Sequence, residues 1–249
     1  LLFVMGLSLF VGSMSIDWRE LITTLRTGEP SVSHTIVFDL RLPRALSALV
    51  VGASLSLAGV LMQVLLRNPL ADPYVLGTSG GAAAFVLLVI FLGLPYQSIP
   101  FAAGVGSILS MGLLFMLARG DGDWSSARLL LTGIVLASGW GALISFILSI
   151  TQGAEIQSML FWLMGDFRAV SPGGVRWALL LAALALSLLV SRDLNLLAGG
   201  ELRAQSLGVS TLMLRLGILF GASLLTAAAV TLSGSIGFVG LVVPHMMRL

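Results

Sequence analysis

Five long apolar segments without a charged side chain constrain the fold of this chain more than any other feature. They cover residues 45–66, 73–118, 129–154, 177–191 and 216–247, and His245 is the only Asp, Glu, Arg, Lys or His among them. A helix needs about 20 such residues to cross a bilayer. Only 10% of the residues are charged, against roughly 25% in an ordinary soluble domain. The chain is therefore predicted to be an all-α integral membrane protein.

Two of these segments are long enough to hold more than one helix. The stretch GLPYQSIP at residues 93–100 contains two prolines and a glycine, which predicts a turn between two spans. The stretch SGSIGFVG at residues 233–240 predicts that a helix is followed by non-helical or re-entrant backbone. With the apolar start of the chain, this gives seven spans, at about residues 1–16, 45–66, 74–93, 101–118, 129–152, 177–191 and 216–236.

The seven spans are expected to form one transmembrane domain over residues 1–249, a polytopic helical bundle. The chain begins inside an apolar run without an initiator Met, and it stops directly after PHMMRL. We therefore expect a fragment that lacks its final spans. The arginines do not set the orientation by the positive-inside rule, because the two sides of a seven-span arrangement would hold six and seven of the 13.

Several kinds of functional group are missing from the spans, and their absence excludes some classes of membrane protein. Ion-coupled carriers and pumps usually hold ionisable residues inside the bundle, whereas these spans carry neutral polar residues such as Thr132, Ser138 and Ser145. Two histidines and no cysteine make no metal-ligand cluster, and no G-x-x-x-x-G-K-[ST] stretch is present to bind ATP. The scattered arginines argue against nucleic acid as a partner. The energy that drives this protein is therefore expected to come from outside this chain.

The stretch LLRNPLADPYVLGTSGG at residues 65–81 interrupts the apolar pattern with two X-Pro pairs. Proline lacks an N–H and disfavours a helical residue before it, so Asn68-Pro69 and Asp72-Pro73 predict a compact turn. Their polar side chains can bond the backbone groups that the prolines leave unpaired. An ordinary interhelical turn would account for this pattern. The small residues of LGTSGGAAA, which follow, favour in addition a close-packed segment at which something passes or closes.

Several stretches carry a resemblance in the same order from about residue 38 onward. They are RLPRALSALVVGASLSLAGVLMQVLLRNPLADPYVLGTSGGAAA, SSARLLLTGIVLA, MLFWLMGDF, LAGGELRAQSLGV and SGSIGFVGLVVPHMMRL. The chain resembles the FecCD-type permeases, the membrane subunits of ABC importers for vitamin B12, iron-siderophores and haem. The resemblance implies about ten spans per subunit, with an inverted repeat that makes GFVGLVVPH the counterpart of LLRNPLADP. It places the amino terminus inside, RLPR outside and NPLADP inside.

The resemblance also implies the partners. A second copy of the permease or a paralogue would complete the pathway in the inner membrane of a bacterium, surrounded by lipid. Separate ABC ATPase subunits would bind and hydrolyse ATP, and a substrate-binding protein would deliver the chelate. The chain itself would be no enzyme and would bind no cofactor, because any metal would travel inside the substrate.

By this resemblance, the first X-Pro turn is one half of a cytoplasmic gate formed by Asn68, Pro69 and Leu70. The other half would be the loop before the fifth span, with Ser125, Ser126 and Ala127. From the residues alone, these serines are equally suited to cap the helix that starts near Arg128.

The segment GGELRAQSLGV is the candidate for coupling to the ATPase. On a helix, Glu201, Ala204, Gln205 and Gly208 fall at i, i+3, i+4 and i+7 and form one small and polar face. The pattern alone also fits a solvated amphipathic turn. The resemblance implies a coupling helix over Gly200 to Gly208, with charged contacts from Glu201 and Arg203. Gly208 is predicted to end it in a left-handed cap.

Two arginines flank a proline at the predicted outer mouth of the second span. Arg41 and Arg44 could extend along the apolar surface to the membrane interface. The resemblance to the B12 importer implies instead that they pair with acidic residues of the substrate-binding protein.

One rival function of another class has a sequence basis. Gly77-Thr78-Ser79-Gly80 gives the G-x-S-G pattern of rhomboid intramembrane proteases, and His245 would complete a dyad. The oxyanion pattern His-x-x-x-Asn is missing upstream, because Phe38 stands four residues after His34. The other alternative, an ion-coupled secondary transporter, lacks the intramembrane charges that it would need.

Overall fold

The computed structural model describes residues 2–12, 19, 32–118, 126–167 and 172–248, and within these ranges the regular structure is helical throughout. The α-helices are α1 (Leu2–Phe10), α3 (Val32–His34), α4 (Leu42–Leu66), α5 (Thr78–Phe91), α6 (Ile99–Ala118), α7 (Ser126–Ile150), α8 (Ala154–Met164), α9 (Gly173–Leu189), α10 (Ser191–Ala198), α11 (Glu201–Ser206), α12 (Thr211–Ser233) and α13 (Val239–Met246). A π-helical segment, η1 (Thr35–Arg41), leads into α4, and short 3-10 turns, η2 (Pro73–Leu76) and η3 (Tyr96–Ser98), precede α5 and α6. The predicted all-α bundle is confirmed.

Four helical segments of the described chain are long and apolar enough to cross a membrane: Val32–Leu66, Tyr96–Ala118, Arg128–Ile150 and Thr211–Ser233. A fifth span results if α9 and α10, which meet at an angle of 68°, are counted together. α5 has only 14 residues. In the predicted span 1–16, residues 2–12 are described, and α1 covers nine of them. The count of seven spans therefore stays a prediction.

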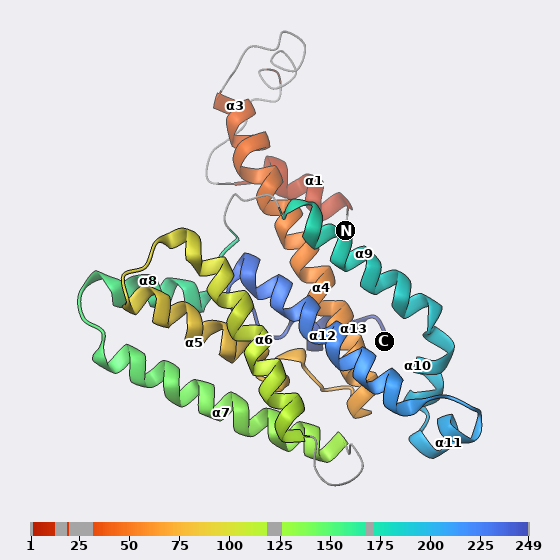
Figure 1. The fold of residues 1–249 in the computed structure, drawn as a ribbon. Coiled ribbons are helices and arrows are strands. Elements are labelled where there is room, and N and C mark those ends of the chain that lie inside the picture. Colours follow the sequence, from red (N-terminus) through yellow and green to blue (C-terminus); the bar gives the residue numbers. More distant parts are fainter. Residues whose placement is uncertain (1, 13–18, 20–31, 119–125, 168–171, 249) are drawn as a thin grey trace.

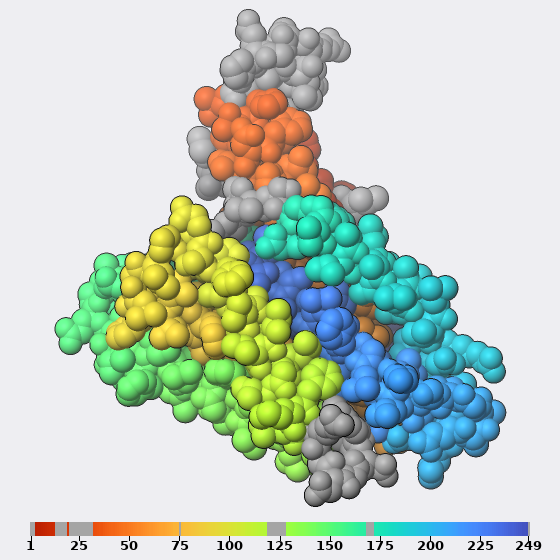
Figure 2. Space-filling view, in the orientation of Figure 1, coloured from red at the N-terminus to blue at the C-terminus, as the bar shows by residue number. Residues whose placement is uncertain are grey.

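α4 and α12 form the centre of the bundle (Figure 1). Leu61, Met62 and Leu65 of α4 belong to one buried cluster with Leu219 and Leu225 of α12. α9, α10 and α11 lie on one side of this pair, and α5 to α8 lie on the other. In the space-filling view, α12 is visible between α6 and α9 (Figure 2).

The outer helices turn large apolar side chains away from the core. On α7, Leu131, Val135 and Phe146 are 63%, 67% and 59% exposed. A soluble protein rarely exposes so continuous an apolar surface. This face is suited to contact lipid tails or another membrane subunit.

Small residues allow α5 to approach α6 and α7 closely. A Cβ built at Gly81 would lie 2.5 Å from the carbonyl oxygen of Gly106 on α6. From α7, the indole N–H of Trp140 donates to Ser110 Oγ at 2.8 Å, and Ser110 Oγ donates to the carbonyl oxygen of Gly77 at 2.8 Å. These two bonds tie the start of α5 to both neighbouring helices, so Trp140 has a polar partner within the bundle.

Two breaks in the helical pattern meet at the centre of the molecule. After α12 ends at Ser233, residues 234–238 are non-helical, as predicted, and α13 then packs against α4. A Cβ at Gly59 would overlap the carbonyl oxygen of Gly240, so the two backbones touch. A Cβ at Gly240 would lie 2.6 Å from Cδ of Pro73, which belongs to the other break.

This backbone contact predicts a steric effect at Gly59. Gly59→Ala should destabilise the protein by about 1–3 kcal/mol, the usual range for overpacking a tight interior. Gly52→Ala is the matched control on the same helix, because a Cβ there meets nothing within 4 Å. Thermal unfolding in detergent should show a lower midpoint for Gly59→Ala alone. Equal midpoints for the two variants would contradict the contact.

Candidate functional site

The candidate residues lie at two opposite ends of α4. Arg41 and Arg44 are at its start, and Asn68 to Leu70 directly follow its end. The helix has 25 residues, which gives about 37 Å at 1.5 Å per residue. α10 packs beside the end of α4 through Leu194 and Leu197, so α11 belongs to the same end (Figure 1). The molecule thus separates a pair of arginines from a turn and a short helix by more than the thickness of a bilayer core.

Local hydrogen bonds determine the shape of the turn after α4. Arg67 adopts a left-handed conformation, with φ of 48°. Its N–H donates to the carbonyl oxygen of Val64, and the N–H of Asn68 donates to that of Gln63. These two bonds form a Schellman motif with an arginine in the place that usually takes glycine. The side-chain Oδ1 of Asn68 accepts from the N–H of Leu70 at 2.9 Å, which closes an Asx-turn.

Leu70 is the apex of this turn. Its side chain is 63% exposed, whereas Ala71, which follows it, is 4% exposed. The turn therefore presents an apolar side chain away from its own subunit on a backbone that Asn68 and Pro69 hold in place.

The second X-Pro pair anchors the turn to the other break. The Asp72 carboxylate accepts a hydrogen bond from the N–H of Tyr74 at 2.8 Å and another from that of Phe238. Burial raises the pKa of Asp72, and these two bonds oppose the shift. Phe238 is left-handed, with φ of 67°. Asp72 thus caps its own break and also bonds to the backbone of the other break. The sequence predicted only the first of these two roles.

The predicted second half of the gate is only partly visible. Ser125 lies outside the described residues. Ser126 and Ala127 begin α7, and their side chains also lie outside the described part. Leu129, in the same turn of α7, is buried in one cluster with Leu65 and Ala71. The start of α7 is therefore at the same end of the bundle as the Asn68 turn.

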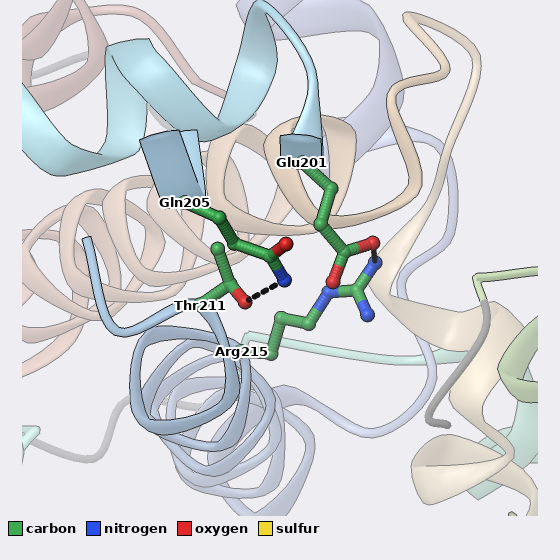
Figure 3. A network of polar contacts seen from close by, with 4 residues as sticks. All are labelled: Glu201, Gln205, Thr211 and Arg215. Carbon is green, nitrogen blue, oxygen red and sulfur yellow. Dashed lines mark hydrogen bonds and ion pairs between the residues drawn. The ribbon is translucent and has the colours of Figure 1, made fainter. Parts of the chain in front are cut away.

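The structure changes the interpretation of α11. Ala204 is fully buried, Glu201 pairs with Arg215 of α12, and Gln205 donates to Thr211 Oγ1 at 3.1 Å (Figure 3). Of the small and polar face predicted from the sequence, Ala204 is buried against this chain and Glu201 is half-buried, whereas Gln205 and Gly208 are exposed. The outward side carries Leu202, 83% exposed, and Leu207, 53% exposed, together with the exposed Arg203 and Ser206.

The end of α11 follows the prediction. Gly208 has φ of 84°. Its N–H donates to the carbonyl oxygen of Gln205, and the N–H of Val209 donates to that of Ala204. Gly208 therefore completes a Schellman motif. Gly200, just before the helix, has φ of 129°, which also favours glycine.

The two arginines at the other end have contacts within the chain. Arg41 Nη1 donates to the carbonyl oxygen of Leu9 at 2.9 Å, in the last turn of α1, where a positive charge is favourable. Arg44 Nη2 lies 3.4 Å from Asp166 Oδ1, and the two side chains are 63% and 56% exposed. Such an exposed pair contributes about 0–1 kcal/mol. Asp166, which the sequence did not single out, is thus a part of this end.

The residues of the protease alternative do not meet in a dyad. Ser79 Oγ lies 3.0 Å from Ser235 Oγ, and the pair joins α5 to the break after α12. His245 lies in the last turn of α13 and is exposed. Ser79 thus has a structural partner, and the geometry gives no support for a nucleophile.

Two hollows of more than 500 Å³ occur in the described part of the chain besides the surfaces above. One is an apolar groove of about 560 Å³ between α9, α10 and α12. The other, of about 590 Å³, is lined by aromatic residues including Tyr96 and Trp162, with Asp166 beside them. Among the described residues, no group of three or more His, Cys, Asp or Glu side chains could hold a metal ion.

Known proteins match this chain over nearly its whole length. It is 38% identical over 246 residues to the Fe(3+) dicitrate transport system permease protein FecD of Escherichia coli (strain K12), covering 97% of this chain and 76% of that protein. It is 37% identical over 259 residues to the vitamin B12 import system permease protein BtuC of Serratia proteamaculans (strain 568), covering 100% and 75%. For the hemin transport system permease protein HmuU of Yersinia pestis, the identity is 38% over 254 residues, covering 96% and 73%.

A solved structure agrees with the fold. It is an inward-facing conformation assigned to the metal-chelate type of ABC transporter, and it matches with a TM-score of 0.84 and 32% sequence identity. The match covers 99% of this chain and 77% of that one. The FecCD transport family matches residues 1–249, and this chain belongs to that family.

Proposed function

We propose that this chain is the permease subunit of an ABC importer and forms one half of a translocation pathway for a metal chelate. The observation that carries the proposal is the arrangement along α4, with the hydrogen-bonded Asn68 turn and the short helix α11 at one end and two arginines at the other. Away from their ends, the described spans carry neutral polar side chains, and Arg215 in the second turn of α12 is paired with Glu201. ATP hydrolysis on a separate subunit would therefore drive transport. The chain itself would bind no cofactor.

The substrate class follows from what the matched relatives share. Their names give ferric dicitrate, vitamin B12 and hemin as cargo, and all three are metals held in an organic chelate. A pathway lined by neutral side chains can pass such a bulky ligand without binding it through a fixed charge.

ATP-dependent uptake by proteoliposomes tests this function. The complete complex, with its ATPase and binding protein, should accumulate at least one of cobalamin, hemin or a ferric siderophore when ATP is supplied. Uptake should need the binding protein. Arg44→Glu should weaken the association with the binding protein, and this loss should be smaller at high salt than at low salt, because exposed charges are screened. Uptake of none of these chelates, or ATP-independent uptake, would contradict the proposal.

We assign docking of the ATPase to the outward side of α11. Leu202 is 83% exposed, whereas Ala204 is fully buried, and exposed apolar side chains of this kind are suited to a protein interface. Ala204 and the half-buried Glu201 would then support the helix, together with the bond from the exposed Gln205 to Thr211, and Arg203 would remain a direct charged contact.

Two substitutions distinguish these faces. Leu202→Arg should lower the affinity for the ATPase by about tenfold or more, equivalent to 1.4 kcal/mol, without changing the thermal midpoint of the subunit. Ala204→Arg should instead lower the midpoint, because the site of Ala204 is fully buried. Binding and thermal unfolding of the purified subunit would be measured. Unchanged affinity of the Leu202 variant would refute this docking surface.

We assign the gate to Asn68, Pro69 and Leu70, with Ser125 to Ala127 as its second part. The exposed apex at Leu70 supports this assignment, since a constriction on a dimer axis needs a side chain that points away from its own subunit. An ordinary turn would place the same side chain in lipid or at a loop surface.

Cysteine cross-linking separates the two possibilities. Residues 1–249 contain no cysteine, so Leu70→Cys introduces a single thiol into this part of the permease. It should cross-link to its symmetry mate in one nucleotide state and not in another, because a disulfide requires Cα atoms within about 7 Å. Leu92→Cys, 58% exposed in the turn after α5 against 63% for Leu70, is the control and should not cross-link. Equal cross-linking in all nucleotide states would refute gating at Leu70.

A further inference from the structure

Two polar contacts join α11 to the start of α12 (Figure 3). Arg215 Nη2 donates to Glu201 Oε2 at 2.8 Å, and Gln205 Nε2 donates to Thr211 Oγ1 at 3.1 Å. Glu201 and Gln205 are four residues apart on α11, and Thr211 and Arg215 are four residues apart on α12. Residues at this spacing lie on the same face of a helix, so the two contacts join one face of α11 to one face of α12. The fully buried Ala204 stands beside them on α11.

The buried arginine is the unusual member of this set. Arg215 lies in the second turn of α12, a candidate membrane span, and its side chain is 6% exposed. A charge in such a helix is unfavourable unless it is paired. Glu201, with a side chain 30% exposed, supplies the opposite charge from a different helix. The pair therefore links α11 to α12 in this orientation, because separating the two helices would remove this carboxylate from the buried guanidinium.

α12 connects this site to the rest of the molecule. It packs along α4, which ends in the Asn68 turn, and its own end leads into residues 234–238. A displacement of α11 would be passed to α12 only if the two helices moved together. The two bonds of the Gly208 cap in the connection 207–210 run back to α11 and not to α12, so side-chain contacts have to join the two helices.

We propose that Glu201 and Arg215 are positioning residues that clamp α11 to α12, so that a movement of the ATPase at α11 displaces α12. This inference rests on the proposed function, because it requires an ATPase at α11. It assigns Glu201 to the interior of the permease, and not to the surface that contacts the partner.

The alternative is that Glu201 only compensates the burial of Arg215. Replacing both residues by methionine separates the two roles. A buried ion pair can often be exchanged for apolar residues of similar volume without loss of stability. Glu201→Met with Arg215→Met should therefore keep the thermal midpoint of the complex. It should nevertheless lose the fixed orientation of α11, because apolar contacts are not directional.

The test uses the complete complex in proteoliposomes and compares the number of substrate molecules transported per ATP hydrolysed. Glu201→Gln and the double methionine variant should both lower this ratio by about tenfold, within the usual range of coupling between sites. The affinity for the ATPase should stay within about twofold of wild type, well below one tenfold step. Glu155→Gln, an acidic residue in the first turn of α8, is the control and should leave the ratio unchanged.

A direct measurement of the clamp does not depend on transport. Spin labels at Ser206 of α11 and Phe220 of α12, both exposed, should give a narrow distance distribution in the wild-type subunit and a broad one in both variants. A narrow distribution with the wild-type transport ratio in the double methionine variant would overturn the clamp. Loss of ATPase affinity in Glu201→Gln would also overturn it, because Glu201 would then be a docking contact. If the wild-type permease bound no ATPase, the proposed function would be refuted instead. The spin-label distances would then still show whether Glu201 and Arg215 hold α11 in a fixed position on α12.

Discussion

The need to pair every backbone N–H and C=O inside a bilayer is the constraint on which this structure depends. Continuous helices meet it automatically, but this chain breaks its helices after Leu66 and after Ser233. At the first break, Arg67, Asn68 and Asp72 satisfy backbone groups that the prolines cannot. At the second, the left-handed Phe238 turns the chain into α13, and its N–H bonds to Asp72. The two breaks therefore support each other.

The sequence predicted most of the helices because apolar, charge-free runs of this length have few other solutions. It also predicted the turn at Gly93, the non-helical segment after Ser233 and the cap at Gly208, since glycine and proline act locally. It placed the start of the last long span at residue 216, whereas α12 begins at Thr211. The error came from Arg215, which reads as a loop residue until its partner Glu201 is known.

Other contacts could not be predicted for the same reason, because the residues that pair are far apart in the sequence. The face of α11 was assigned correctly as small and polar, but whether it faces a partner or α12 depends on Arg215, which is 14 residues from Glu201. Asp166 is 122 residues from Arg44, so no local pattern could indicate the contact. α8 was not among the predicted spans, because its 11 residues are too few to cross a bilayer and Glu155 interrupts the apolar run.

The strengths of these links differ between the two ends of α4. At the α11 end, the Glu201–Arg215 pair is largely buried, and breaking a buried pair costs about 3–5 kcal/mol. At the other end, the Arg44–Asp166 pair is more than half exposed, which makes it worth about 0–1 kcal/mol. A protein that approaches Arg44 with a carboxylate could therefore replace Asp166 at small expense, whereas α11 would stay attached to α12. This asymmetry suits a subunit that exchanges one partner at one end and receives mechanical work at the other.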